Sequence, residues 1–424
     1  MDWLLKLAFR QIIERGSLII RSPSGQTLSF GDGQGPPVGI RFTDRMAVVA
    51  LVLDPDLKLG ELYTDGRLIM EQGGIYDFLR LVHDQPAALR KPLLGRLVDR
   101  ARLALRWLSH SNGAARSRRN VAHHYDLDGR LYDLFLDEDR QYSCAYYETP
   151  EATLEEAQRA KRRHIAAKLA LRPGDRVLDI GCGWGGLGLY LAGVAGAGEV
   201  LGVTLSEEQL ATAQRRARES GLDGAVRFEM QDYRAVEGRF DRIVSVGMFE
   251  HVGLHNQRTF FEKCKSLLAD DGVMLLHTIG LSDGPWFTNP WIDKYIFPGG
   301  HLPALSELMP WIEKSGLVLT DVEILRLHYA STLRDWRERF MARRGEAAKL
   351  YDERFCRMWE FYLAGCEAAF RWRNVVVFQL QLARKQDAAP LTRNYIEEGE
   401  AALRRAEAGS GRSAVPEGRR LASV

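Results

Sequence analysis

The chain has 424 residues, of which 46% are hydrophobic and 27% charged, and its formal net charge is +2. This composition is typical of a soluble globular protein of two or three domains, and the near-neutral charge argues against a nucleic-acid binder. Five scattered cysteines without a C-x-x-C pair argue against a disulfide framework or a structural zinc site, favour a reducing compartment, and lead us to expect no metal.

The N-terminal part is predicted to be a small α+β domain over residues 1–109. "LLKLAFRQIIERG" has helical periodicity, and "SLIIRS" and "VGIRFT" are typical of strands. "MAVVALVLDP" is apolar and β-branched, and "LKLGELYTDGRLIME" indicates a strand and a turn followed by an extended segment. Residues 86–109 predict a basic amphipathic helix, which suits an anionic surface, and residues 110–120 form a polar linker.

The N-terminus itself does not indicate a signal peptide. Charged residues interrupt its apolar ones, and no cleavage site of small residues follows. No apolar run in the chain reaches about 18 residues, so we expect no membrane span and only peripheral contact with lipid.

Residues 121–408 alternate between strands and helices, which predicts a parallel sheet with helices on both faces. The five expected strands lie in "RVLDIGCGWGG", "EVLGVTLS", "AVRFEMQDY", "FDRIVSVGMFEHV" and "GVMLLHTIG". A helix follows the second strand, with Ser206 as its N-cap and Gly221 at its end. After Leu333 the chain is expected to be mostly helical and aromatic, and residues 409–424 to be a disordered tail.

The first strand ends in a glycine-rich turn in which Asp179 precedes Gly181 and Gly183. Such glycines let the backbone pass close to a ligand, but a G-x-G-x-x-G dinucleotide pattern fits the same residues, and a turn without a ligand is a third alternative. An NAD site favours an acid at the end of the second strand, where this chain has Thr204. The third strand ends instead with Asp232 and Tyr233, which suit an adenine. The pattern resembles S-adenosylmethionine (SAM) binding in class I methyltransferases.

Eight separated segments then narrow the family. In chain order they are "QYSCAYY", "VLDIGCGWGG", "GVTLSEEQ", "QDYR", "FDRIVSVGMFEHVG", "LLHTIG", "WIDKYIFPGGHLP" and "HYASTLRDW". Together they resemble the cyclopropane-fatty-acyl-phospholipid synthases, relatives of the mycolic acid cyclopropane synthases, over residues 120–385. The resemblance implies a class I SAM-dependent methyltransferase (Rossmann-like α/β) fold with an added helical lipid-binding part. It also implies transfer of a methylene unit from SAM to a cis double bond of membrane phospholipid.

The chemistry sets its own requirements. Methylation of an alkene leaves a carbocation, so the site needs an apolar tunnel, aromatic faces that stabilise positive charge, and a base near the new methyl group. Aromatic candidates are Trp286, Trp291, Tyr295 and Phe297, although each has core packing as its ordinary alternative. Glu250 and His251 are expected to end the fourth strand and His277 the fifth, so that they meet at the ligand crevice.

The resemblance also assigns residues. It implies a bound bicarbonate ion as the base, held by the side chains of Glu250, His277 and Tyr329 and by the backbone N–H groups of Cys144 and Ile279. For SAM, the implied positions are Tyr142, Ser143, Gly181, Gly183, Thr204, Gln209, Gln231, Asp232 and Tyr233, together with Asp179 of the motif. It further implies a homodimer in the cytoplasm that contacts the inner face of the membrane. On this interpretation Cys144 is part of a lid segment and is not a nucleophile.

Other functions stay open. A related enzyme with the same fold gives a methyl-branched or methylene fatty acid, depending on where the base lies. A lipid-binding module without catalysis is disfavoured by Glu250, His277 and Tyr329. A methyltransferase for small molecules or nucleic acid is disfavoured by the apolar, aromatic C-terminal half.

Overall fold

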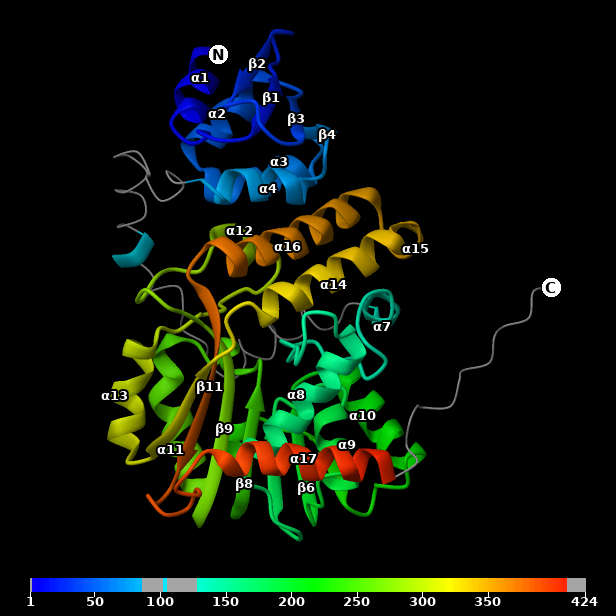
Figure 1. The fold of residues 1–424 in the computed structure, drawn as a ribbon, viewed down its shortest axis with the longest axis vertical. Helices are drawn as coiled ribbons and strands as arrows, with labels where there is room; N and C mark the ends of the chain where they lie inside the picture. Colours follow the sequence, from blue (N-terminus) through cyan, green and yellow to red (C-terminus); the bar gives the residue numbers. More distant parts are fainter. Residues whose placement is uncertain (1, 86–101, 105–127, 410–424) are drawn as a thin grey trace, which may run out of the picture.

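Residues 2–85 form a small α+β unit at one end of the protein in the computed structural model, which describes residues 2–85, 102–104 and 128–409 (Figure 1). Its sheet has the order β2-β1-β3-β4, in which β1 runs parallel to β3 and antiparallel to β2. The elements are α1 (Asp2–Arg10), β1 (Ser17–Arg21), β2 (Thr27–Phe30), β3 (Pro37–Phe42), α2 (Arg45–Leu53), α3 (Pro55–Thr64), β4 (Leu68–Gln72) and α4 (Ile75–His83).

Helix α3 corrects the strand expected in "LKLGELYTDGRLIME", and the apolar β-branched segment before it is helix α2. Two caps explain both helices. The Asp44 carboxylate accepts from the N–H of Ala47 at 2.9 Å, and Asp54 caps α3, whose first residue is Pro55. Only the end of the quoted segment is extended, as β4. The expected basic helix, the linker and the domain boundaries at 109 and 120 lie almost wholly outside the described residues, and the tail after Gly409 lies outside them entirely.

The larger part of the chain is built on a seven-stranded sheet of order β10-β11-β9-β8-β5-β6-β7. Five neighbouring strands are parallel, as the alternating pattern predicts. They are β5 (Arg176–Ile180), β6 (Glu199–Thr204), β7 (Val226–Met230), β8 (Phe240–Val246) and β9 (Leu268–Leu281). The helix after β6, α10 (Glu207–Glu219), has its expected cap, since Ser206 Oγ accepts from the N–H of Gln209 at 3.3 Å.

Two strands were not anticipated. β11 (Val375–Ala383) lies in the segment expected to be helical, and it pairs antiparallel with both β9 and β10 (Val318–Ile324). The sheet is therefore mixed rather than wholly parallel. β11 is almost completely buried, so its apolar run carries no alternation that separates a central strand from a buried helix.

Helices cover both faces of this sheet. Val177 of β5 belongs to a core shared with α8 (Leu154–Lys168), α9 (Gly186–Gly193) and α10, whereas its neighbour Leu178 faces α11 (Gln257–Leu267) and α13 (Leu305–Ser315). The remaining helices are α7 (Gly129–Tyr132), α12 (Pro290–Tyr295), α14 (His328–Ala342), α15 (Arg344–Leu350), α16 (Glu353–Trp372) and α17 (Asn394–Gly409). α17 lies across α8 on the outside of the molecule (Figure 1).

The N-terminal unit contacts the rest of the protein through α3 and α4, which lie on α16 and α12 (Figure 1). The backbone of Gly60 lies so close to Trp291 and Phe361 that a Cβ there would be 2.5 Å from Trp291 Nε1. Beside it, Glu61 Oε1 accepts from Lys294 Nζ at 2.7 Å and from the Tyr295 hydroxyl at 2.9 Å. The interface thus combines close packing with a polar contact that is partly exposed.

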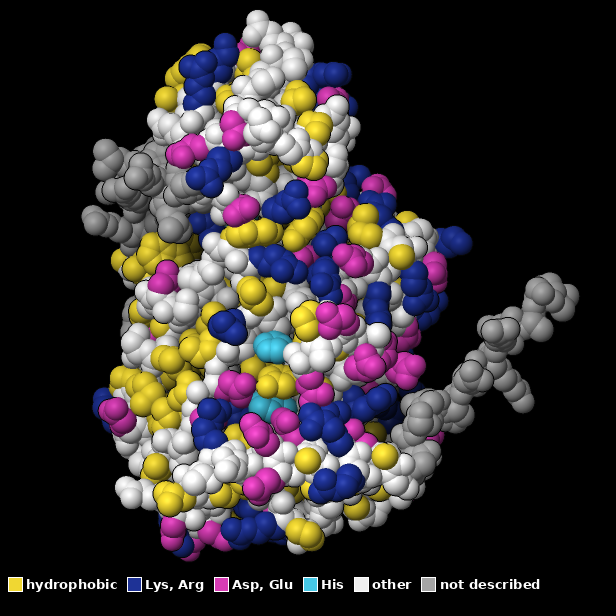
Figure 2. Space-filling model, viewed as in Figure 1, with side chains coloured by type: hydrophobic (Ala, Val, Ile, Leu, Met, Phe, Trp, Pro, Cys, Tyr) yellow, Lys and Arg dark blue, Asp and Glu magenta, His cyan; other side chains and the backbone are white. Residues whose placement is uncertain are grey.

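The surface agrees with the near-neutral charge. Basic and acidic side chains are interspersed across the face shown in Figure 2. Among the described residues, no helix combines the length and the apolar composition needed to cross a membrane.

Candidate functional site

A cavity opens at the carboxyl ends of β5, β6 and β8, where the glycine turn passes from β5 to α9. Gly181 has φ +84°, in the left-handed region that favours glycine, and a Cβ there would lie 2.7 Å from the Met248 side chain. All ten predicted cofactor residues line this one cavity: Tyr142, Ser143, Asp179, Gly181, Gly183, Thr204, Gln209, Gln231, Asp232 and Tyr233. The structure therefore brings together segments that are up to 91 positions apart (142 to 233).

One end of the cavity holds a buried carboxyl group. Asp179 is 2% exposed, and its Oδ2 has no hydrogen-bond partner among the described residues. Burial raises the pKa of Asp179 to about 7, because a carboxylate loses its hydration there. A buried acceptor without a partner suits a cationic or hydrogen-bond-donating ligand.

The opposite side carries the polar groups that follow β6 and β7. Thr204 Oγ1 donates to Gln209 Oε1 at 2.9 Å, which fixes the Gln209 amide and leaves its nitrogen as a donor. The Asp232 carboxylate accepts from Arg234 at 2.8 and 2.6 Å. Sequence reasoning overlooked this pair, in which the backbone N–H of Arg234 also donates to Asp232 at 3.0 Å.

The predicted lid segment, Gln141–Tyr147, contributes Gln141, Tyr142 and Ser143 to the lining of the cavity. The hydroxyl of Tyr142 lies 2.8 Å from that of Tyr362, and its ring stacks on Trp336 with centroids 5.1 Å apart. The Ser143 hydroxyl accepts from Lys161 Nζ at 2.8 Å. These contacts hold the two residues at the cavity that the glycine turn also lines, and their action as a lid stays a prediction.

Lys161 is a lining residue that the sequence reasoning missed. Its ammonium group also donates to Gln141 at 2.7 Å, and burial lowers its pKa to about 8. In sequence it belongs to the charged run "AKRRH" of α8. Its position on the helix could have indicated burial. Lys161 lies seven residues after the buried Leu154 and four before the buried Ile165, so it shares their face of α8.

The second group of predicted residues surrounds Glu250, next to the cavity. β8 ends at Val246, so Glu250 stands in a 3₁₀ turn (Phe249–His251) after the strand and not at its end. Val246 pairs with His277 of β9, and β9 continues to Leu281. β8 and β9 are neighbours, as expected. Glu250, however, lies on the turn after β8, and His277 lies within β9 rather than at its end.

Glu250 and Ile279 form a pair. The Ile279 N–H, expected to bind an anion directly, instead donates to Glu250 Oε1 at 2.6 Å. Glu250 Oε2 has no partner among the described residues, and burial raises the pKa of Glu250 to about 7. The carboxyl can therefore carry or release a proton near neutral pH.

His277 is a neutral donor. Its Nδ1 lies 3.2 Å from the Gln379 amide nitrogen, which leaves the ring proton on Nε2. Burial lowers the pKa of His277 to about 3, so the imidazole stays uncharged at neutral pH.

The residue after Cys144 is hydrogen-bonded to α14, the helix that carries Tyr329. The N–H of Ala145 donates to Thr332 of α14 at 3.0 Å, and Tyr329 begins the same helix, packed on Phe370. Cys144 is completely buried, and burial raises the pKa of its thiol, which disfavours a nucleophilic thiolate.

None of the five predicted catalytic residues lines the cavity itself. Their neighbours Ser143 and His251 do, and a Cβ on Gly247 would lie 3.7 Å from the side chain of Ser143. Glu250 and Cys144 are therefore each the chain neighbour of a residue that lines the cavity. Whether they act on one ligand stays a prediction.

The four aromatic candidates take different places. Phe297 lies 5.9 Å from the His251 ring and 6.0 Å from Tyr362, so it is next to the cavity. Trp291 and Tyr295 pack beneath α3 of the N-terminal unit. Trp286 is 40% exposed.

Comparison with known proteins places these features in context. Residues 113–380 match the family described as mycolic acid cyclopropane synthetase. The chain is 40% identical over 348 residues to the cyclopropane-fatty-acyl-phospholipid synthase of Escherichia coli (strain K12), covering 82% of this chain and 88% of the relative. It is 37% identical over 355 residues to a probable fatty acid methyltransferase of Pseudomonas putida, covering 82% and 87%.

Among solved structures, the mycolic acid cyclopropane synthase CmaA1 complexed with SAH and CTAB is similar, with 35% identity and a TM-score of 0.59. The match covers 63% of this chain and 98% of that one. The shared fold is that of SAM-dependent methyltransferases, as the sequence predicts.

Proposed function

This chain belongs to the mycolic acid cyclopropane synthetase family and is a SAM-dependent methyltransferase, and we propose that it forms cyclopropane fatty acids in membrane phospholipid. The reaction adds a methylene unit from SAM to the cis double bond of an unsaturated acyl chain. The observation that carries the proposal is the convergence of all ten expected cofactor residues on one cavity, flanked by the buried Glu250 and His277.

The residues present fit SAM. When bound, SAM supplies an electrophilic methyl group on a sulfonium. The orphaned Oδ2 of Asp179 suits the positively charged amino group of its methionine part, and the glycine turn admits a ligand against the backbone. Asp232 and Tyr233 would hold the adenine, and Thr204 with Gln209 the ribose or methionine part.

The acyl chain must react away from water. Attack of the alkene on the methyl carbon would form a carbon–carbon bond as the methyl–sulfur bond breaks, so that S-adenosylhomocysteine leaves and the positive charge passes to the lipid. Aromatic faces then stabilise that cation. Phe297 and Tyr362 lie at the cavity edge, and they continue into a buried cluster with Trp359 and Phe135.

Loss of a proton from the new methyl group closes the ring. Bicarbonate is the base that we propose, with Nε2–H of His277, the hydroxyl of Tyr329 and the N–H of Cys144 as its donors. Among the described residues nothing accepts from that N–H, which fits the assignment. Ile279 would act through Glu250, whose pKa of about 7 lets it share a proton with the anion.

A methyl-branched or methylene product is the alternative, and the fatty acid methyltransferase named among the relatives favours keeping it. The same cation gives these products when a different proton leaves. The assay is incubation of the protein with SAM and vesicles of dioleoyl phosphatidylglycerol, followed by mass spectrometry of the released fatty acids. A ring and a branched alkene differ in their fragments after oxidative cleavage. No consumption of SAM with these vesicles would contradict the enzymatic proposal.

The site assignment is tested by Glu250→Gln, which we expect to lower turnover at least 100-fold while SAM still binds. Glu262→Gln is the matched control, because Glu262 lies on the surface of α11, paired with Arg258. Normal activity of Glu250→Gln would show that the proposed anion site is wrong.

We also propose that the protein acts as a homodimer and contacts the membrane peripherally. Trp3, Leu7 and Met46 are more than half exposed on the N-terminal unit, which suits contact with lipid. Sedimentation velocity tests the dimer. Flotation with anionic vesicles tests the membrane contact. Binding that neither salt nor neutralisation of the basic residues at 116, 118 and 119 weakens would contradict a role for the basic stretch 86–119.

A further inference from the structure

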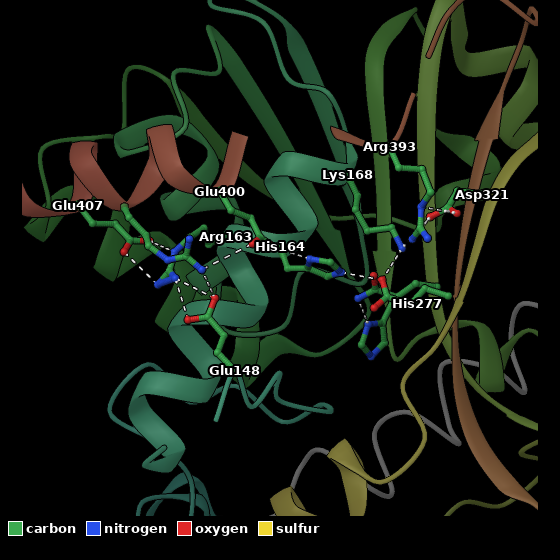
Figure 3. Close-up of polar contacts among 12 residues, drawn as sticks. Glu148, Arg163, His164, Lys168, His277, Asp321, Arg393, Glu400 and Glu407 are labelled. Carbon is green, nitrogen blue, oxygen red and sulfur yellow. Dashed lines mark hydrogen bonds and ion pairs between the residues drawn. The ribbon is translucent and has the colours of Figure 1, made fainter. Parts of the chain in front are cut away.

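Helix α17 lies beyond the residues that match the family and is fastened to α8 by charged side chains (Figure 3). Glu400 contacts His164 at 2.6 Å, and Glu407 accepts from Arg163 at 3.3 Å and from the Tyr190 hydroxyl at 2.7 Å. The contact between Glu400 and His164 connects α17 to the candidate site.

His164 uses both ring nitrogens. Nδ1 lies 2.6 Å from Glu400, and Nε2 lies 2.8 Å from Glu323 of β10. A neutral imidazole has one donor and one acceptor, and an acceptor would face a carboxylate oxygen. The geometry therefore requires the imidazolium, which donates to both carboxylates. The side chain is 6% exposed, so bulk water screens these contacts weakly.

Charged side chains of both signs surround His164. Lys168 on α8 pairs with the same Glu323 at 2.9 Å and with Asp321 at 3.3 Å, and Arg393 pairs with Asp321 (Figure 3). On α17, Arg404 lies 3.6 Å from Glu400. His328 of α14 is a second imidazole close to His164.

Tyr146 of the lid segment stacks on this imidazolium. The ring centroids of Tyr146 and His164 are 4.3 Å apart at 9°, and the opposite face of Tyr146 stacks on His328 at 4.9 Å and 10°. The N–H of Tyr147 donates to His328 Nδ1 at 3.0 Å. Tyr146 is thus held between α8 and the N-terminus of α14. It lies two residues after Cys144, and its partner His328 is the residue before Tyr329.

We propose that His164, held as a cation between Glu323 and Glu400, is a positioning residue for the lid segment, and that α17 acts on the site through Glu400. A cation on an aromatic face attracts it, and the two carboxylates fix the plane of the ring on which Tyr146 rests. This inference rests on the proposed function, because the lid carries Tyr142 and Ser143 at the cavity and Cys144 beside it.

The test compares two glutamates on one helix. Glu400→Gln and His164→Gln should each lower kcat/KM on unsaturated phospholipid vesicles about tenfold and weaken SAM binding by calorimetry at least threefold. Glu407→Gln removes a comparable contact of α17 that does not reach Tyr146, so both values should stay within twofold of wild type. His164→Arg, which keeps the charge and can stack on Tyr146, should restore most of the loss.

Nitrogen NMR of histidine-labelled protein supplies a second readout that needs no substrate. At pH 7.5, the signals lost in His164→Gln should be those of an imidazolium, and Glu400→Gln should shift them toward the neutral form. Equal losses in Glu400→Gln and Glu407→Gln, or a neutral His164 in the wild type, would overturn the proposal. A wild-type protein that leaves vesicles unmodified would refute the proposed function, and SAM affinity and the NMR spectra would still decide the role of His164.

Discussion

Gly60→Ala should destabilise the protein, although alanine in place of glycine usually stabilises a helix. Gly60 lies inside α3, where alanine is favoured over glycine by about 1 kcal/mol. The new Cβ, however, would lie 2.5 Å from Trp291 Nε1 and 2.7 Å from Phe361. Both rings are buried and rigid, so α3 must move away from the larger part of the protein.

The two effects can be weighed. Overpacking of a filled interface costs about 1–3 kcal/mol, which offsets the gain in helix propensity and leaves a net loss of up to about 2 kcal/mol. Gly365 provides the control, because it lies inside α16 and its added Cβ would meet no atom within 4 Å. Gly365→Ala should therefore stabilise the protein by about 1 kcal/mol.

Urea unfolding measures the difference, followed by tryptophan fluorescence and by circular dichroism. Gly60→Ala should be less stable than Gly365→Ala by about 1–3 kcal/mol, which is the overpacking cost alone, because the helix propensity gain is common to both. Equal stability of the two variants would show that Gly60 does not limit the approach of α3 to Trp291.

Three further outcomes are expected. Gly181→Ala combines a left-handed φ with a contact at 2.7 Å to Met248, so SAM affinity measured by calorimetry should fall at least tenfold in a folded protein, and unchanged affinity would contradict the cavity assignment. Burial raises the pKa of Glu250 from 4.5 to about 7, so the stability that its bound proton adds is complete below pH 4.5 and is lost as the pH rises through 7. Thermal unfolding should show the wild type losing about 3 kcal/mol relative to Glu250→Gln across that window, and parallel pH profiles would refute the shift. Cys144→Ser should keep more than about a tenth of the activity, because the thiol is buried and protonated; a folded but inactive variant would restore a chemical role for the sulfur.

The cofactor cavity could be predicted because its residues follow short local signals. Asp179, Thr204 and Asp232 each lie within two residues of the end of a strand whose apolar run is readable in isolation. Parallel strands bring their carboxyl ends to one edge of the sheet. The family resemblance supplied Tyr142 and Ser143, which no strand pattern indicates. The structure adds the contacts with Tyr362 and Lys161 that hold them.

Other features of the fold and the site could not be predicted, because they depend on contacts between segments that are distant in the sequence. β11 was expected to be helical because its burial on both faces removes the alternation of a strand. α3 was expected to be a strand because the cap at Asp54 is weaker as a signal than the apolar residues that follow it. The pairing of the Ile279 N–H with Glu250 arises from a turn after β8 and could not be inferred from spacing.

The position of β11 also affects how the protein folds while it is being synthesised on the ribosome. β9 and β10 are complete by Ile324, yet they flank β11, which begins only at Val375. Until β11 emerges, β9 presents an unpaired edge to any other nascent chain. Translation that stalls or terminates in this interval leaves an aggregation-prone half-sheet, and the last strand must insert between two that are already made. Demand for chaperones should therefore peak late in synthesis, between about three-quarters and nine-tenths of the chain, before β11 has emerged.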